Sequence, residues 1–252
     1  MSGTSLDGVD VSIIESDGKS EYSSILDRYY EYDDKLTQKI HEIRDKISHS
    51  KDLNKYEQEI KALERDITLF NYKAVNETIK IANSEINIIG FHGQTIFHNS
   101  KEKISKQLGD GKLLSQLSKK KVVYDFRKND LDNGGQGAPL ASIFHNVMAN
   151  KINKKFNLSF PINILNIGGI ANVTITVDEK NLWNKEKIYS YDIGPGNCLI
   201  DEWMRKNSKK KYDVNGLTSK NGKIDKLVLN QALENFSQNQ NYEKSLDVKN
   251  FD

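Results

Sequence analysis

The chain has 252 residues, enough to bury the core of one or two domains. Its 37 Lys and Arg residues nearly balance 35 Asp and Glu residues, and a net charge of +2 gives no electrostatic footprint for nucleic acid. The single cysteine, Cys198, excludes an internal disulfide, no apolar run reaches membrane-spanning length, and the first residues lack a signal-peptide pattern. We therefore expect a cytoplasmic protein that binds small molecules, without nucleic-acid or membrane partners.

The first half of the sequence predicts a strand pair followed by helices. Val9 to Glu15 and Ile25 to Tyr32 alternate apolar and polar residues on either side of an S-D-G-K corner, which is typical of a β-hairpin. From Asp33 to Ser84 apolar residues recur at helical spacing, so amphipathic helices are expected there. Two short strands follow, at Ile86 to Phe91 and Val122 to Phe126. Each ends in a polar, glycine-bearing segment, and ligands of α/β folds bind beyond the carboxyl ends of strands.

The second half predicts a smaller α/β unit. A helix from about Ala138 to Lys151 is expected to close a first lobe, and the Lys- and Asn-rich stretch up to Asn157 is the candidate linker. The elements expected beyond it are strands at 162–165, 170–177 and 188–192 and helices at 198–206 and 227–236. These are fewer strands than a lobe matched to the first would need. We therefore expect an N-terminal lobe at 1–157 and a C-terminal lobe at 158–252 that is truncated at the C-terminus.

A short pattern occurs twice at a constant offset. In the segments Thr4 to Ile13 and Gly168 to Val177, Leu6 aligns with Ile170, and both segments are glycine- or asparagine-bearing turns that enter an alternating strand. Gly and Asn tolerate the left-handed backbone of tight turns, and small residues before them leave amides open to an anion. Two such loops facing each other would clasp the phosphates of one nucleotide. The alternative is two unrelated hairpins that share common strand residues.

The first of these loops, Gly3 to Asp10, carries two hydroxyls and two carboxylates. Thr4 and Ser5 are suited to donate hydrogen bonds to phosphate oxygens, and Asp7 is suited to hold a hydrated Mg²⁺. Asp7 and Gly8 also fit a plain D-G hairpin turn, so both interpretations stay open.

Polar side chains follow the two short strands of the first half. His92, Gln94 and Thr95 offer several hydrogen-bonding groups in a short space, suited to hydroxyls or amides of a sugar. A single His at a strand end is more often a structural hydrogen-bond partner than a catalyst, so we interpret His92 as a binder rather than a base. Arg127 follows the second strand, and its guanidinium is suited to clamp a carboxylate such as a lactyl group.

A glycine-rich segment, G-G-Q-G-A-P-L at 134–140, lies downstream of Asp125 and Arg127. Its glycines let the backbone approach a ligand closely, and Pro139 is suited to the first turn of the next helix. The alternative is a glycine-rich connector without a ligand.

Asp192 is the candidate general base. The strand pattern places it at a strand end, just before a G-P-G turn and a helix N-terminus, where a carboxylate facing a cleft can accept a proton. Asp201 and Glu202, on the following helix, are interpreted as surface or helix-pairing charges.

Five motifs occur in this order: M-S-G-T-S-L-D-G-V-D, G-F-H-G-Q-T, D-F-R-x-x-D-x-x-x-G-G-Q-G-A-P-L, L-N-I-G-G-I-A-N-V and D-I-G-P-G-N. Together they make the chain resemble the anhydro-N-acetylmuramic acid kinases over its whole length. The resemblance implies an α/β, two-lobe actin-like ATPase fold with duplicated ribonuclease-H-like lobes that bind ATP between them, the second lobe being truncated here. It also explains the repeat as one phosphate-binding hairpin per lobe.

The resemblance implies an ATP-dependent sugar kinase of peptidoglycan recycling. The γ-phosphoryl group of ATP would pass to O6 of 1,6-anhydro-N-acetylmuramic acid while water opens the anhydro bridge at C1, giving N-acetylmuramic acid 6-phosphate and ADP. Mg²⁺ would neutralise the phosphates, with Asp7 as the candidate ligand, and a homodimer is expected from the family.

The resemblance also assigns roles to residues of this chain. Asp192 matches the base that activates the water. The ATP phosphate-binding residues would be Gly3, Thr4, Ser5, Leu6, Asp7, Gly8, Val9, Asp10, Asn166, Gly168, Gly169 and Asn172. The sugar-binding residues, with those singled out above, would be His92, Gln94, Thr95, Asp125, Arg127, Gly135, Gln136, Gly137 and Pro139.

Two departures from the family pattern keep other functions open. Family members usually carry a short strand ahead of M-S-G-T-S, and they continue into a section with an adenosine-binding glycine motif. A catalytically inactive, truncated sugar-binding fragment is therefore the main alternative. A third possibility is an actin-like or chaperone-like ATPase that acts on protein, although Arg127 beside the G-G-Q-G loop favours a small anionic ligand.

Overall fold

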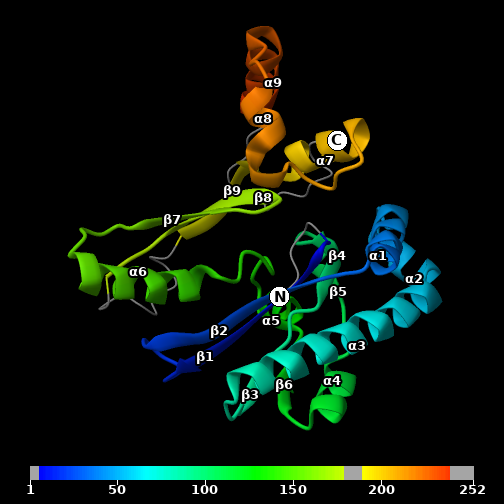
Figure 1. Ribbon diagram of the computed structural model, residues 1–252, viewed down its shortest axis with the longest axis vertical. Helices are drawn as coiled ribbons and strands as arrows, with labels where there is room; N and C mark the ends of the chain where they lie inside the picture. Colours follow the sequence, from blue (N-terminus) through cyan, green and yellow to red (C-terminus); the bar gives the residue numbers. More distant parts are fainter. Residues whose placement is uncertain (1–5, 179–188, 239–252) are drawn as a thin grey trace.

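A computed structural model describes residues 6–178 and 189–238, which form a mixed α/β fold (Figure 1). Within these residues the strands form four small sheets: three strand pairs and one three-stranded sheet. No helix of this described part is both long and apolar enough to cross a bilayer.

The predicted N-terminal hairpin is confirmed. Strand β1 (Gly8–Ser16) pairs antiparallel with β2 (Tyr22–Glu31). The connecting turn is held by Asp17, whose Oδ1 accepts hydrogen bonds of 2.9–3.0 Å from the backbone N–H groups of residues 19–21. These bonds lower the pKa of the Asp17 carboxyl, because they stabilise its charged form.

The predicted amphipathic helices are confirmed as α1 (Asp34–Lys46), α2 (Ser50–Lys55) and α3 (Glu57–Ala82). Asp33 caps α1 by accepting a 2.8 Å hydrogen bond from the Leu36 N–H. The apolar faces of α1 and α3 pack with residues of the neighbouring strands into the main core: Leu6, Val9, Tyr32, Leu36, Ile40, Ile43, Ile47, Ile60, Leu63, Ile67, Ile96 and Leu108.

The middle of the chain forms two strand pairs. Strand β3 (Ile88–Gly90) runs parallel to β6 (Lys121–Val123), and β4 (Gln94–Asn99) pairs antiparallel with β5 (Ile104–Leu108). Helix α4 (Gly111–Ser118) connects β5 to β6. The short strand predicted after the helices is therefore confirmed.

The strand predicted at 122–126 ends earlier than expected. Asp125 takes a left-handed backbone conformation (φ 59°), which ends the extended chain, and α5 (Phe126–Asp132) begins at the next residue. The prediction that Arg127 directly follows a strand is wrong, because Arg127 lies in the first turn of α5.

Helix α6 (Ser142–Phe156) also differs from its predicted bounds. It begins after Pro139, so the prediction that Pro139 lies in its first turn is wrong. The segment predicted as a linker is helical as far as Phe156. Two lysines of α6 contact the first hairpin: Lys151 Nζ donates to the Tyr22 carbonyl at 2.6 Å, and Lys154 Nζ lies 3.1 Å from Glu21 Oε1.

The predicted elements of the last part are confirmed. Strands β7 (Asn163–Ile167), β8 (Ile170–Ile175) and β9 (Tyr189–Pro195) form the three-stranded antiparallel sheet, and α7 (Cys198–Asn207) follows. A 3-10 turn (Val214–Gly216), α8 (Leu217–Asn221) and α9 (Lys226–Gln238) complete the described residues.

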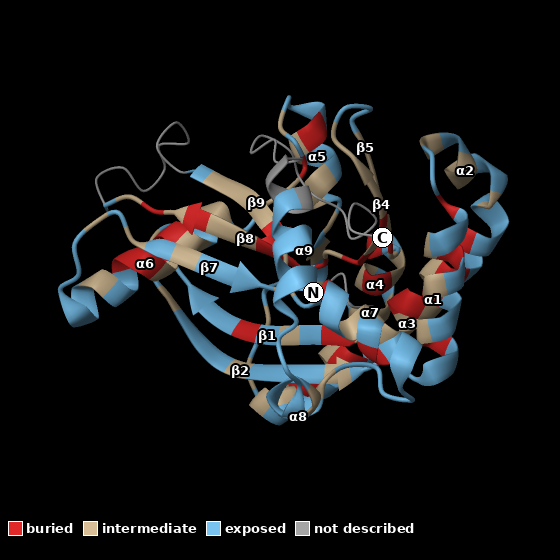
Figure 2. Cartoon of the chain, turned by 90° about the horizontal axis from the view of Figure 1, so that it is seen from above, coloured by how far each residue is buried: buried red, intermediate tan, exposed pale blue. Residues whose placement is uncertain are grey.

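Helix α9 stands away from the rest of the molecule in Figure 1, and Figure 2 shows its residues 226–234 as exposed. The large apolar residues among these are Leu227, Val228, Leu229 and Leu233.

Helix α3 contributes Ile60, Leu63 and Ile67 to the main core. Ile67 is fully buried, whereas Ile81 of the same helix is 48% exposed. We expect Ile67→Ala to lower the free energy of unfolding by about 2–5 kcal/mol, because it removes buried methylene groups and leaves a cavity. The matched control Ile81→Ala should change it by no more than about 0.5 kcal/mol. Urea denaturation followed by circular dichroism measures both, and equal losses would contradict this account of the core.

Candidate functional site

Arg127 connects the polar segments that follow the two short strands. Its Nε donates to Nε2 of His92 at 3.0 Å, and its Nη1 donates to the carbonyl oxygen of Gly137 at 3.0 Å. His92 lies between β3 and β4, Arg127 in α5, and Gly137 in the glycine-rich segment. The fold therefore brings together three of the predicted sugar-binding residues.

The hydrogen bonds of His92 fix its tautomer. A guanidinium N–H can only donate, so Nε2 of His92 is the unprotonated acceptor. The proton is on Nδ1, which lies 2.8 Å from the carbonyl oxygen of Gly93. Burial, and then the Arg127 cation, lower the pKa of His92 to about 4. The imidazole is therefore neutral at neutral pH, and both of its nitrogens bind protein atoms.

Asp130 shapes the glycine-rich segment. Its Oδ2 accepts a 2.8 Å hydrogen bond from the Gly137 N–H, and its carbonyl oxygen accepts one of 2.8 Å from the Gly135 N–H. A Cβ atom at Gly135 would lie 2.1 Å from the Asp130 carboxylate, so a side chain at this position would displace that carboxylate from its bond to Gly137. The segment is thus an ordered loop built around Asp130, whose role sequence reasoning missed; the signal was the aspartate in the D-F-R-x-x-D part of the motif.

The other predicted sugar-binding residues differ in how far they are buried. Gln94 is fully buried, and Thr95 is partly buried and accepts a 3.4 Å hydrogen bond from Gln107 Nε2. Both belong to β4 rather than to a loop. Asp125 and Gln136 are exposed, and Pro139 is partly buried.

Asp192 lies within electrostatic reach of Arg127. Burial lowers the pKa of the Arg127 guanidinium, and the negative charge of Asp192 opposes this shift. Asp192 is in the middle of β9, so the prediction that it ends a strand is wrong. The ladder with β8 continues beyond it, because Ile170 still pairs with Pro195.

A row of three predicted site residues crosses the second sheet. Asn166 of β7 lies opposite Asn172 of β8, and Asn172 lies opposite Asp192 of β9. Directly opposed residues of antiparallel strands point to the same face. The strand register therefore puts two predicted phosphate-binding residues and the predicted base on one face of the sheet.

The G-P-G-N turn after β9 packs on the β7–β8 turn. The carbonyl oxygen of Gly169 accepts hydrogen bonds from the N–H groups of Gly196 (2.9 Å) and Cys198 (3.2 Å), and that of Gly168 accepts one from Asn197 (2.8 Å). A Cβ atom at Gly196 would lie 2.2 Å from the Gly168 oxygen. The second predicted phosphate hairpin and the start of α7 are therefore one packed unit.

The first predicted phosphate loop is described only from Leu6 onward, so Gly3, Thr4 and Ser5 lie outside the described residues. The Leu6 side chain is buried in the core, and the Asp7 carbonyl accepts a 2.8 Å hydrogen bond from the Tyr32 N–H. Val9 is buried as well, and Asp10 is exposed. Leu6 and Val9 thus anchor the loop through their side chains.

The negative charge of Asp7 acts on two neighbouring side chains. Tyr29 lies close enough to Asp7, Glu31 and Asp10 for their charges, after burial, to raise the pKa of its hydroxyl. Burial first, and then the charge of Asp7, also raise the pKa of Asp201 on α7. The charge of Arg205, four residues after Asp201 on α7, opposes this shift, which agrees with the interpretation of Asp201 as a helix-pairing charge; its side chain is partly buried. Glu202 does form a helix pair, with Lys206.

Among the described residues, no group of three or more His, Cys, Asp or Glu side chains is arranged to hold a metal ion. Mg²⁺ at phosphates usually takes one or two protein carboxylates and keeps several waters, so a single carboxylate such as that of Asp7 fits its chemistry. The assignment of Asp7 as a magnesium ligand stays a prediction.

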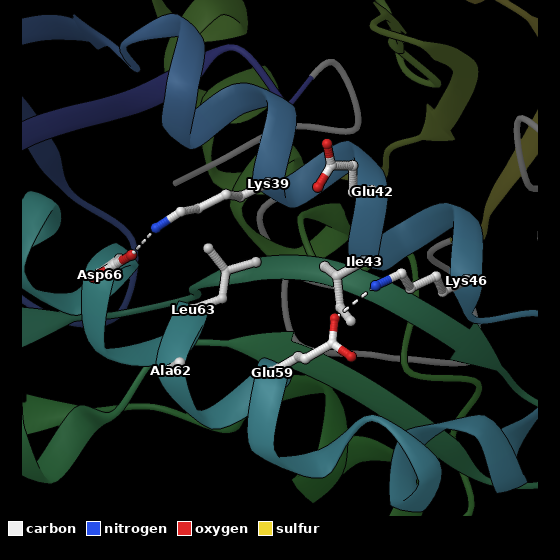
Figure 3. A pocket seen from close by; sticks show the side chains of 8 residues that line it. All are labelled: Lys39, Glu42, Ile43, Lys46, Glu59, Ala62, Leu63 and Asp66. Carbon is white, nitrogen blue, oxygen red and sulfur yellow. Dashed lines mark hydrogen bonds and ion pairs between the residues drawn. The ribbon is translucent and has the colours of Figure 1, made fainter.

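The groove in Figure 3 lies between α1 and α3, away from all of these residues. Two ion pairs span it: Lys39 Nζ to Asp66 Oδ2 at 2.8 Å and Lys46 Nζ to Glu59 Oε2 at 2.7 Å. All four side chains are exposed to solvent, so these pairs join two helices at a surface and do not form a site.

Comparison with known proteins places the chain in a family. The family model described as anhydro-N-acetylmuramic acid kinase matches residues 1–251. The chain belongs to this family. An anhydro-N-acetylmuramic acid kinase of Pelagibacter ubique is 54% identical over all of this chain and 65% of its own length. Those of Brucella canis and Agrobacterium fabrum are 34% and 33% identical, again over all of this chain and 66% of their length. The chain therefore spans about 65% of the length of these relatives.

The neutral His92 predicts an acid-sensitive stability. An unfolded imidazole binds its proton near pH 6.5, but folded His92 binds it only near pH 4, so between these values the unfolded state holds more protons. Stability should fall as pH falls through this window, by up to about 3 kcal/mol. Urea unfolding of wild type and His92→Gln across the window measures the effect. The difference between the two profiles isolates His92 because all other groups are shared, and parallel profiles would contradict the assignment.

Proposed function

We propose that this chain takes part in the ATP-dependent phosphorylation of 1,6-anhydro-N-acetylmuramic acid with hydrolytic opening of the anhydro ring. The products would be N-acetylmuramic acid 6-phosphate and ADP. One observation carries the proposal within this family member: Asp192 shares a sheet face with Asn166 and Asn172 and lies within electrostatic reach of Arg127. A base, polar groups suited to phosphate and a cation for the acidic sugar thus belong to one region.

The two-lobe actin-like architecture is part of the proposal, with lobes at 1–157 and 158–252. Its support is that the repeated segments have matching partners. In the first, Gly8 of β1 lies opposite Glu31 of the next strand; in the second, the aligned Asn172 of β8 lies opposite Asp192 of the next strand. A duplication of one supersecondary unit accounts for both the sequence repeat and this common pairing.

In the proposed mechanism, the carboxylate of Asp192 accepts a proton from water as the water attacks C1 of the sugar. The C1–O6 bond breaks, and O6 takes the γ-phosphoryl group of ATP where an ordinary glycosidase would supply a proton. Arg127 keeps N–H donors beyond the two used by His92 and Gly137, and these would bind the lactyl carboxylate of the sugar.

The proposed phosphate contacts come from both repeated loops. Residues 3–10 would bind the ATP phosphates from one side, and Asn166, Gly168, Gly169 and Asn172 from the other. Mg²⁺, held at the phosphates with Asp7 as a ligand, would neutralise their charge during transfer. A place in peptidoglycan recycling in the cytoplasm, and a homodimer, follow from the family only and belong to this proposal.

A second candidate function is a sugar-binding protein of this family that does not turn over. Its support is that His92, Arg127 and Gly137, which belong to the proposed sugar site, are joined by hydrogen bonds of 3.0 Å. It differs from the first candidate in the nucleotide step, since both need the same sugar site.

Asp192→Asn tests the proposed base. The chain is incubated with MgATP and 1,6-anhydro-N-acetylmuramic acid, and the 6-phosphate product is measured by mass spectrometry. We expect the substitution to lower turnover by about 100-fold or more, because an amide cannot accept the proton. The matched control is Asp132→Asn, which alters an exposed carboxylate of α5 and should leave turnover unchanged.

Unchanged turnover in Asp192→Asn would overturn the role of Asp192. A folded wild-type chain that binds the sugar in calorimetry but forms no product would instead establish the second candidate.

A further inference from the structure

The guanidinium of Arg127 is held on two edges before any ligand binds. His92 and Gly137 each take one of its five N–H donors, which leaves three for an incoming group. The two holding atoms come from segments on opposite sides of α5 in the sequence. The plane of the guanidinium, and the direction of its free donors, are therefore set by the positions of these two acceptors.

Each acceptor is itself anchored. On one side, Nδ1 of His92 lies 2.8 Å from the carbonyl oxygen of Gly93, and Gly93 is so close to β5 that a Cβ atom on it would lie 2.5 Å from the Leu108 oxygen. On the other side, Asp130 Oδ2 accepts the Gly137 N–H at 2.8 Å. Arg127 is thus held through contacts that reach the backbone of β5 on one side and the Asp130 carboxylate of α5 on the other.

We propose that His92 is a positioning residue that acts on the substrate only through Arg127, by giving the Arg127 Nε–H a neutral acceptor and so aiming the remaining donors at an anionic group of the sugar. This inference rests on the proposed function for the identity of that group. It replaces the expectation that His92 itself binds sugar hydroxyls, because both ring nitrogens already bind protein atoms.

A neutral acceptor is the chemistry this position requires. An acidic side chain would pair with the guanidinium and compete with the substrate carboxylate, whereas an apolar one would leave the Nε–H without an acceptor in a partly buried site. A flexible arginine would also lose side-chain entropy on binding, a cost that a fixed one avoids. Histidine, neutral here because burial and Arg127 disfavour its charged form, meets both needs.

Two substitutions test the roles of the two ring nitrogens of His92 separately. In His92→Gln the side-chain oxygen is as many bonds from Cβ as Nε2 is, so the acceptor for Arg127 is kept. In His92→Asn the amide ends at the distance of Nδ1, so the acceptor for Arg127 is lost. Circular dichroism and thermal melting establish that each variant is folded.

Binding of 1,6-anhydro-N-acetylmuramic acid is measured by calorimetry for wild type, both His92 variants, Arg127→Met and the double variant His92→Asn/Arg127→Met. We expect His92→Asn to weaken binding by about 10-fold, because it removes one hydrogen bond to a charged group. His92→Gln should weaken binding by less than about threefold, because it keeps that hydrogen bond. In the Arg127→Met background, His92→Asn should have no further effect.

The neutral analogue 1,6-anhydro-N-acetylglucosamine, which lacks the lactyl carboxylate, should bind all folded variants alike. Additive effects of the two substitutions, or an equal loss of affinity for the neutral analogue, would overturn the proposal in favour of direct contact between His92 and the sugar.

Nitrogen-15 NMR gives a readout that does not depend on the sugar. We expect Nε2 of His92 to be unprotonated at neutral pH, and the Arg127 Nε–H signal to be protected from exchange in wild type and His92→Gln but not in His92→Asn. An Arg127 signal equally protected in His92→Asn overturns the positioning role. A wild-type chain with the expected NMR signals but no sugar binding overturns the proposed function instead.

Discussion

The partly buried cation of Arg127 is the constraint on which the candidate site depends. A guanidinium removed from water needs hydrogen-bond acceptors or a negative charge nearby, and here it has both. His92 and Gly137 accept its protons, and Asp192 supplies the opposing charge. The segment before β4, helix α5, the glycine-rich loop and strand β9 are therefore tied to one side chain. A shift of any of these segments would therefore change the position or the surroundings of the guanidinium.

Close backbone packing is the second constraint, and it explains glycines that the repeat alone did not explain. A Cβ atom at Gly8 would lie 2.4 Å from the Tyr30 oxygen, and one at Gly196 would lie 2.2 Å from the Gly168 oxygen. In both halves, a turn that leads into or out of a strand is pressed against the neighbouring strand or turn. Glycine is needed there for space between protein segments, whether or not a phosphate also binds.

Sequence reasoning succeeded where the signal was local and periodic. The first hairpin, the amphipathic helices α1 and α3 and the hairpin of β7 and β8 all follow from alternating or helical patterns. It failed where a long-range contact or a single residue conformation decided the outcome. The left-handed Asp125 ended β6 early, and α6, two of whose lysines contact the distant first hairpin, continues through the predicted linker.

In the candidate site, too, the residue types could be predicted from the sequence and the contacts between them could not. Residue types and motifs identified Arg127, His92 and Asp192, but not their relation to each other. That Arg127 uses His92 as an acceptor, and that Asp192 lies mid-strand opposite Asn172, are facts of tertiary pairing. Asp130 was overlooked because an aspartate that binds backbone amides looks, in sequence, like any polar loop residue.

The proposed sugar contacts and nucleotide contacts meet in the second sheet. The contacts around Arg127 and the row that ends at Asp192 use residues 92–192, and all of these contacts lie in described residues. The proposed nucleotide contacts draw on residues 3–10 and on Asn166, Gly168, Gly169 and Asn172, of which Asn166 and Asn172 share the row with Asp192. A sugar site is therefore common to both candidate functions, and the nucleotide step alone decides between them.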